Sequence, residues 1–273
     1  MTQAEAQAAP PQRLPAGACP TTRVGLSEGT LVITDLHLAP FGDERTRRFV
    51  QLCDRLEGVP ALICLGDLFD MWVCRRQAGM EGSKPVLDAF ERLTRRGTEV
   101  HLVPGNRDAL IGAWFEKRTG GRLHRDGFVG ELEGGVRAVF VHGDALCTRD
   151  TGYLRLRSLW RLPPVRLISW LAPMWFARRV GSRLRGLSEA SKPVKLAEEK
   201  AIQRDAVCRV AREAGATALA CGHAHDVRDE SLSGEAEPVR WIVVGAWEWE
   251  QDLLRIGKAG GLELGSWATI GAR

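Results

Sequence analysis

Short apolar runs, each followed by a small or polar residue, recur along this chain. Five of them precede residues with metal-binding capacity, at residues 31–34, 61–65, 100–103, 136–141 and 216–221. Continuous apolar runs of four to six residues are typical of strands that are buried on both faces. Two more runs, at residues 239–244 and 253–256, predict closing strands near the C-terminus.

Stretches with helical periodicity lie between these runs, at residues 44–57, 84–96, 111–119 and 197–214. Strands that alternate with helices indicate an α/β fold with layered sheets. Ligands of such folds gather beyond the carboxyl ends of the strands. We therefore expect the polar residues that follow the apolar runs to converge on one site.

Residues 149–195 break this alternation, because Arg, Trp, Leu and Pro mix there without any strand signal. We predict a helical cap inserted over the site. The segment holds eleven basic and two acidic residues, a net charge of +9, while the whole chain carries +4. The rest of the chain is therefore acidic, and the cap is suited to an anionic partner.

The predicted domains follow from this pattern. Residues 1–27 are expected to form a disordered tail, residues 28–148 and 196–273 the catalytic domain, and residues 149–195 the cap. Seven cysteines without a close pair favour reduced thiols in a cytosolic enzyme. The longest uncharged apolar stretch, residues 167–177, is too short to span a membrane, which takes about 20 residues.

The polar residues after the strands form five motifs that supply carboxylate, amide and imidazole groups. They are Asp35-Leu36-His37, Gly66-Asp67, Gly105-Asn106-Arg107-Asp108, His142-Gly143-Asp144 and Gly222-His223-Ala224-His225. Such donors suit Mn²⁺, Fe²⁺ or Zn²⁺, and there are enough of them for two ions. Two ions about 3.5–4 Å apart that share a carboxylate can activate water near neutral pH and hold phosphoryl oxygens. Asp67, in the middle of the set, is the expected bridge.

Each motif alone is more often a turn or a buried core residue than a ligand. Five of them in this order, each after a predicted strand, favour a metal-dependent phosphoesterase. Glycines beside the ligands would let the backbone approach a phosphate closely. His101 and His124 lie outside the pattern, and we expect them to be core residues.

The order of these motifs resembles the calcineurin-like metallophosphoesterase superfamily over residues 32–247. That resemblance implies an α/β fold of two mixed β-sheets flanked by helices. It also implies two divalent metal ions, with manganese the expected metal. One ion would be held by Asp35, His37, Asp67 and His225. The other would be held by Asp67, Asn106, His142 and His223.

Within that superfamily, the motifs that begin at Asp35, Gly66 and Gly105, with residues 142–153, 188–195 and 244–247, resemble the UDP-2,3-diacylglucosamine hydrolases of lipid A biosynthesis. Those enzymes split a pyrophosphate into UMP and a lipid monosaccharide phosphate. Many superfamily members carry a histidine that helps the leaving group depart where this chain has Arg107. Arginine does not release a proton, but a phosphate leaving group needs no acid. Catalytic roles are thus expected for Asn106 and Arg107.

The resemblance also implies a set of substrate contacts: Asn106, Arg107, Asp150, Ser188, Lys192, Lys195 and His223. Some residues depart from the family pattern, namely Lys192, Ala109, Ala224 and Asp226. The departures leave open a related enzyme that acts on a soluble nucleotide or another lipid pyrophosphate. A non-enzymatic binding module on this scaffold would be expected to lack some of the metal ligands of the family, and this sequence lacks none of them.

The cap interleaves aromatic side chains with arginines, a composition that suits the interface between lipid headgroups and acyl chains. The aromatic residues are Trp160, Trp170, Trp175 and Phe176. An alternative is that these aromatic residues only pack the cap onto the body. No nucleic-acid-binding module is recognisable, so nucleic acid is not an expected partner. We expect a lipid–nucleotide substrate and a cytoplasmic protein bound peripherally to the inner membrane; the oligomeric state is not indicated.

Overall fold

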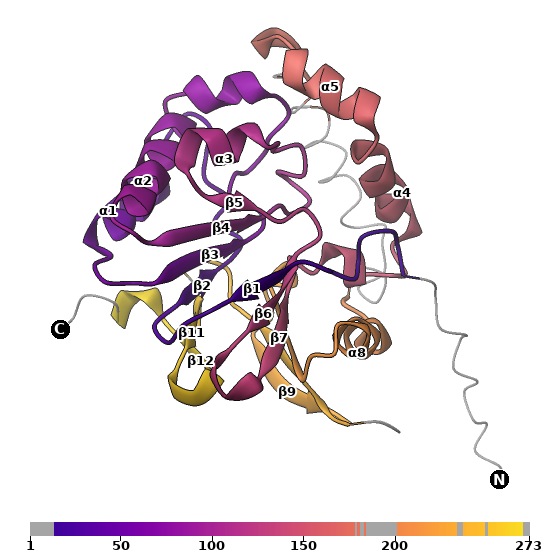
Figure 1. The fold of residues 1–273 in the computed structure, drawn as a ribbon. Coiled ribbons are helices and arrows are strands. Elements are labelled where there is room, and N and C mark those ends of the chain that lie inside the picture. The colour runs from indigo at the N-terminus through magenta and orange to yellow at the C-terminus, as the bar shows by residue number, and fades with distance from the viewer. Residues whose placement is uncertain are drawn as a thin grey trace.

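The computed structural model describes residues 14–177, 179–180, 183, 201–233, 237–248 and 251–269. In this part of the chain, two six-stranded sheets form the centre of the molecule (Figure 1). Sheet A has the order β1-β6-β7-β8-β10-β9, and sheet B the order β12-β11-β2-β3-β4-β5. The strands are β1 (Arg23–Gly25), β2 (Leu31–Ile33), β3 (Ala61–Leu65), β4 (Glu99–Val103), β5 (Arg122–Leu123), β6 (Phe128–Glu131), β7 (Arg137–Phe140), β8 (Ala218–Cys221), β9 (Arg228–Leu232), β10 (Val239–Val243), β11 (Leu253–Ile256) and β12 (Leu262–Gly265).

Both sheets are mixed, with parallel strands at their centres. Strands β2, β3, β4 and β5 pair in parallel, as do β7, β8 and β10. The antiparallel pairs are β11 with β2 and with β12 in sheet B, and β9 with β10 and β6 with β7 in sheet A. This arrangement places the carboxyl ends of β2, β3 and β4 at one edge of sheet B.

Helices cover the outer faces of the two sheets. The α-helices are α1 (Glu44–Arg55), α2 (Ser83–Arg95), α3 (Trp114–Thr119), α4 (Thr151–Trp160), α5 (Pro163–Leu171) and α8 (Arg204–Glu213). Helices α1, α2 and α3 lie on sheet B, and α8 lies on sheet A (Figure 1). Along β3, Ile63 and Leu65 face the core between the sheets, whereas Leu62 and Cys64 face the helices. Burial on both faces explains why this strand reads as a continuous apolar run.

Helices α4 and α5 lie within residues 149–195, where the sequence predicted a helical cap. Asp150 caps the start of α4, its carboxylate accepting a hydrogen bond from the backbone N–H of Tyr153 at 2.9 Å. Pro163 begins α5, a position where its missing N–H costs nothing. Arg166 ties α5 to the body by donating to the backbone oxygens of Ala109 and Ile111. None of the helices within the described residues is long and apolar enough to cross a membrane.

Two predicted elements differ from the structure. Residues 1–27 were expected to be a disordered tail, but Arg23–Gly25 forms β1 and pairs in parallel with β6, and Val24 is buried. A three-residue strand held by ladder hydrogen bonds leaves too short an apolar signature to be recognised. The helix predicted over residues 197–214 begins later, because Gln203 is extended and α8 starts at Arg204.

Candidate metal centre

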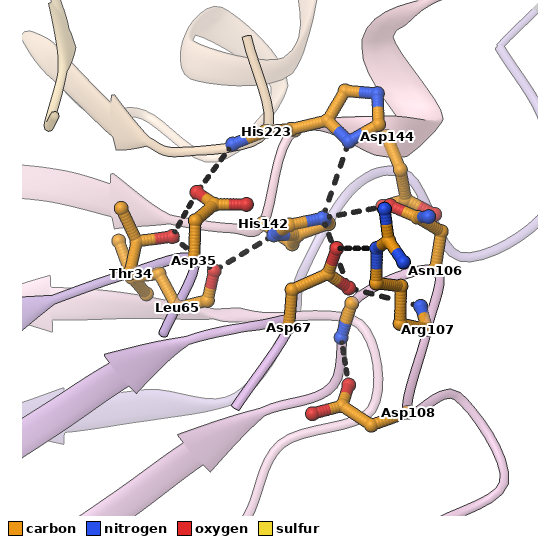
Figure 2. A network of polar contacts seen from close by, with 12 residues as sticks. Thr34, Asp35, Leu65, Asp67, Asn106, Arg107, Asp108, His142, Asp144 and His223 are labelled. Carbon is orange, nitrogen blue, oxygen red and sulfur yellow. Dashed lines mark hydrogen bonds and ion pairs between the residues drawn. The ribbon is translucent and has the colours of Figure 1, made fainter. Parts of the chain in front are cut away.

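Five of the predicted ligands are seen in Figure 2 to meet where neighbouring strands end: Asp35, Asp67, Asn106, His142 and His223. Asp35 and Asp67 follow β2 and β3, and Asn106 lies just beyond β4. From sheet A, His142 follows β7 and His223 follows β8. Residues distant in the sequence are thus brought together by the parallel order of the central strands.

One group of donors surrounds Asp35, which is fully buried. Its Oδ1 atom lies 3.9 Å from Nε2 of His37 and 3.3 Å from Nε2 of His225. Its other oxygen, Oδ2, accepts hydrogen bonds from the Thr34 hydroxyl at 2.7 Å and from the His223 backbone N–H at 2.8 Å. Among the described residues, Oδ1 has no hydrogen-bond partner. It is therefore the oxygen that is available to an ion.

A second group of donors surrounds His142. Its Nδ1–H donates to the backbone oxygen of Leu65 at 2.8 Å, so in the neutral ring Nε2 carries the lone pair. That Nε2 atom lies 3.1 Å from Oδ1 of Asn106, 3.3 Å from Nδ1 of His223 and 3.7 Å from Oδ1 of Asp67. When the ring is neutral, Nε2 and these neighbouring atoms can all act as ligands, an arrangement that fits a divalent cation.

Asp67 connects the two groups through its two oxygens. Oδ2 lies 3.8 Å from Nδ1 of His37, and Oδ1 lies 3.7 Å from Nε2 of His142. Asp35 also lies close to donors of both groups. Oδ2 of Asp35 accepts two hydrogen bonds, whereas Oδ1 of Asp67 accepts one, from the backbone N–H of Arg107 at 2.9 Å. Because the two oxygens of Asp67 also face different donor groups, Asp67 is the better placed to bridge a pair of ions.

The electrostatics of these groups also fit cations. Burial lowers the pKa of His37 to about 3 and that of His223 to about 4, so both rings are neutral and able to ligate. Burial alone would lower the pKa of His142, but the negative charges of Asp67 and Asp35 raise it to about 9. In the absence of ions, a proton on His142 balances part of this negative charge. A divalent ion would supply that positive charge instead.

The backbone at the ligands is unusual. Five non-glycine residues of the centre have φ between +48° and +66°, namely Asp35, His37, Asp67, His223 and His225. Left-handed backbone at such residues costs on the order of 1–3 kcal/mol each and persists where surrounding structure enforces it. Glycine is also required nearby, because a Cβ on Gly66 would lie 2.3 Å from Nδ1 of His142, and one on Gly222 would lie 2.0 Å from Oγ1 of Thr34.

Residues 30–227 match the family model described as calcineurin-like phosphoesterase, which is more than half of the chain. The chain belongs to the calcineurin-like phosphoesterase family. Curated relatives of this phosphoesterase carry the name UDP-2,3-diacylglucosamine hydrolase. One from Pseudomonas putida KT2440 is 34% identical over 84% of this chain and 95% of its own, and one from P. putida W619 is 36% identical over 80% and 90%. One from Aeromonas salmonicida is 33% identical over 80% and 85%.

Family membership and the two donor groups together imply that this phosphoesterase is a hydrolase dependent on divalent metal ions. The fold expected from the sequence is confirmed, since two mixed sheets flanked by helices are observed. His101 and His124 are buried in the core, as expected, with Nδ1 of His101 lying 3.0 Å from Nε2 of His124.

Near the metal ligands, two buried aspartates had no role predicted from the sequence. Asp108 accepts hydrogen bonds from the backbone N–H groups of Gly105 and Leu68, and so joins the loops that carry Asn106 and Asp67 (Figure 2). The place of Asp108 in the Gly-Asn-Arg-Asp motif was the available signal. The second is Asp144, which accepts hydrogen bonds from the Tyr153 hydroxyl and from Nε of Arg157. The place of Asp144 in the His142-Gly143-Asp144 motif was the available signal, but its partners Tyr153 and Arg157 were not indicated by the sequence.

The expected substrate contacts are only partly placed by the structure of this phosphoesterase. Arg107 lies beside the metal ligands, with its Nε 3.6 Å from Oδ2 of Asp67 and its Nη1 3.0 Å from Oδ1 of Asp70. Asp150 is half-buried at the start of α4. Ser188, Lys192 and Lys195 lie outside the described residues.

Proposed function

We propose that this phosphoesterase hydrolyses the pyrophosphate bond of UDP-2,3-diacylglucosamine, giving UMP and 2,3-diacylglucosamine 1-phosphate in lipid A biosynthesis. The observation that carries the proposal is the pair of donor groups joined by Asp67. The names of the curated relatives, which match over most of the chain, supply the substrate.

The proposed metal sites divide the seven ligands into two sets that share Asp67. Asp35, His37, Asp67 and His225 hold one ion, and Asp67, Asn106, His142 and His223 hold the other. Manganese is the proposed metal, because carboxylate, amide and imidazole donors suit it. When bound, two such ions supply an activated water and positive charge for the phosphoryl oxygens.

In this proposal, the guanidinium of Arg107 interacts with the phosphates of the substrate. Its side chain is 28% exposed, and so can reach solvent and substrate from beside Asp67. The hydrogen bond to Asp70 at 3.0 Å fixes one side of the guanidinium. Nη2 of Arg107, which has no hydrogen bond to another described residue, can stabilise charge that builds up on the phosphoryl oxygens. A guanidinium cannot protonate a leaving group, and a phosphate leaving group does not require this.

The proposed location is the cytoplasmic face of the inner membrane. Helix α5 and the residues that follow it expose large apolar side chains, among them Leu167, Ile168, Trp170, Leu171 and Trp175. Arginines lie beside them, and Cζ of Arg75 lies 5.5 Å above the ring of Trp170. Exposed aromatic and aliphatic groups with cationic neighbours suit a surface of anionic lipid. Asp150, Ser188, Lys192, Lys195 and His223 are the proposed contacts to the sugar and phosphates of the lipid.

The test is UMP release from UDP-2,3-diacylglucosamine by the purified protein with Mn²⁺, measured by chromatography. Samples with a chelator and samples with an unacylated UDP-sugar are the controls. We expect release that depends on Mn²⁺ and on the acyl chains. Hydrolysis of the unacylated nucleotide alone would instead favour the soluble-substrate enzyme that the departures at Ala109 and Lys192 left open.

A further inference from the structure

A cavity of about 90 Å³ is lined in part by Pro104, Gly105 and Ala109, which belong to the loop that carries Asn106. It is partly open to solvent and is lined by residues of α4, α5, the loop after β4 and the loop between β5 and β6, together with Asp144. Four of its lining residues are arginines; the full lining is Pro104, Gly105, Ala109, Arg125, Asp144, Arg157, Trp160, Arg161 and Arg166. The volume is well above the roughly 10–15 Å³ that one water requires, so a phosphate group fits.

Two of the four arginines are neutralised by carboxylates. Nε of Arg157 lies 3.2 Å from Oδ2 of Asp144, and Nη2 of Arg161 lies 2.6 Å from Oδ1 of Asp126. Asp144 is the one carboxylate in the described lining of the cavity, and it also accepts the hydroxyl of Tyr153. No negative charge therefore remains in this lining for the other two arginines.

Arg125 and Arg166 carry this uncompensated positive charge. Arg166 donates to the backbone oxygens of Ala109 and Ile111, which are neutral. Within the described residues, Arg125 has no ion pair or hydrogen bond. Burial, together with the nearby charges of Arg125 and Arg161, lowers the pKa of Arg166 to about 10. Repulsion between these guanidinium groups would be relieved by an anion bound between them.

We propose that this cavity binds the phosphoryl group of a phosphomonoester, at a position separate from the two-metal centre. The planar guanidinium matches two oxygens of a phosphate at once, and such charge-assisted pairs are strong. A phosphomonoester carries close to two negative charges at neutral pH. It therefore matches the two uncompensated arginines, Arg125 and Arg166, better than a carboxylate does.

The phosphoryl group can come from a soluble phosphate or from the headgroup of a phospholipid. A lipid source is compatible with the exposed apolar side chains on α5, which lies next to α4 in Figure 1. Either source would bring the same phosphoryl group to Arg125 and Arg166. The experiment therefore measures binding of inorganic phosphate and of lipid vesicles in parallel.

Arg125→Glu is the principal variant, because the Arg125 side chain is exposed and has no hydrogen bond or ion pair to another described residue. Arg125→Ala removes the charge without allowing a new pair with Arg166. Arg155→Glu is the matched control, since it makes the same change at an exposed arginine of α4 outside the cavity. Thermal unfolding of all three variants shows that they are folded.

Calorimetric titration of the metal-loaded protein with inorganic phosphate is the first measurement. We expect one class of sites to weaken by about tenfold or more in Arg125→Glu and Arg125→Ala, and to stay unchanged in Arg155→Glu. Any phosphate bound at the metal ions is common to all variants and cancels in the comparison. Equal binding by wild type and Arg125→Glu would overturn the proposal.

Flotation with phosphatidylcholine vesicles, with and without phosphatidic acid, distinguishes the sources. Loss of the phosphatidic acid dependence in Arg125→Glu, but not in Arg155→Glu, assigns the site to a lipid headgroup. Loss of phosphate binding with unchanged flotation assigns it to a soluble phosphate. Neither measurement involves hydrolysis, so the anion site and the proposed enzymatic activity are tested independently.

Discussion

Asp67 is the residue on which the geometry of the metal centre depends, because each of its oxygens faces a different donor group. We predict that Asp67→Ala lowers turnover by several orders of magnitude and reduces the bound metal. Kinetics at saturating Mn²⁺ and metal analysis of the purified protein test both parts. Asp88→Ala, which removes a carboxylate from the surface of α2, is the control. Activity within tenfold of wild type would exclude Asp67 as the bridge.

Arg107 is predicted to act on the phosphates without holding metal. Its backbone N–H donates to Oδ1 of Asp67, and its side chain pairs with Asp70. Arg107→Ala should therefore lower turnover by about a hundredfold, the scale of one lost charge-stabilising donor, with the metal content unchanged. Arg122→Ala, at an exposed arginine of β5, should leave both unchanged. If Arg107→Ala instead loses metal, the role of Arg107 is to support the ligand loops.

The positions of the proposed ligands could be predicted from the sequence, because each follows a strand that is itself visible as an apolar run. Their conformation could not. The positive φ angles of Asp35, Asp67 and His223 are set by contacts between loops that are distant in the sequence. The hydrogen bonds of Asp108 to the loop of Asp67 likewise join residues about 40 positions apart, and no local pattern specifies them.

Whether a whole strand could be predicted also depends on whether it is visible in the sequence as an apolar run. The central strands β2, β3, β4, β7 and β8 were predicted, because they are buried on both faces. The edge strands β1, β5, β9 and β12 were not, nor was β6, which lies between β1 and β7. Strand β9, Arg228–Leu232, reads Arg-Asp-Glu-Ser-Leu and has no apolar run; it is held by five pairs with β10. Such strands exist because a neighbour offers its backbone groups, and a single sequence does not show that neighbour.

The proposed lipid specificity belongs to α5 and the residues that follow it. Trp170 and Trp175 are 49% and 69% exposed, and Phe176 contacts Trp175 edge-on. Replacing Trp170, Trp175 and Phe176 by serine should reduce hydrolysis of the diacylated substrate by about tenfold or more. Hydrolysis of a small chromogenic phosphodiester should change little.

Phe41→Ser is the matched control, because Phe41 is a similarly exposed aromatic residue outside the cap. It should affect neither substrate. An equal loss on both substrates in the triple variant, with circular dichroism unchanged, would contradict acyl binding by the cap. That result would favour a soluble substrate.

At the scale of the whole molecule, stability depends on pH through a buried histidine pair in sheet B. Burial and the neighbouring His101 lower the pKa of His124 from 6.5 to about 4. The unfolded chain therefore binds a proton between these values that the folded chain does not. The stability present above pH 6.5 is lost as the pH falls toward 4, by about 3 kcal/mol.

Urea unfolding at pH 7 and at pH 4.5, for wild type and His124→Gln with a chelator present, measures this effect. The free energy of unfolding should fall further in wild type than in the variant, because glutamine does not titrate. A variant whose stability falls as steeply as that of wild type would show that His124 is not responsible.

The left-handed backbone of the ligand residues affects which substitutions are selected when a library of variants is screened. Asp35, His37, Asp67, His223 and His225 each occupy a conformation that glycine adopts at little cost. A library screened only for resistance to unfolding should therefore enrich glycine or asparagine at these five positions, and its survivors should be inactive. A screen for catalysis should restore the original residues. The two screens would select different residues at these positions, because there the requirements of folding and of metal binding conflict.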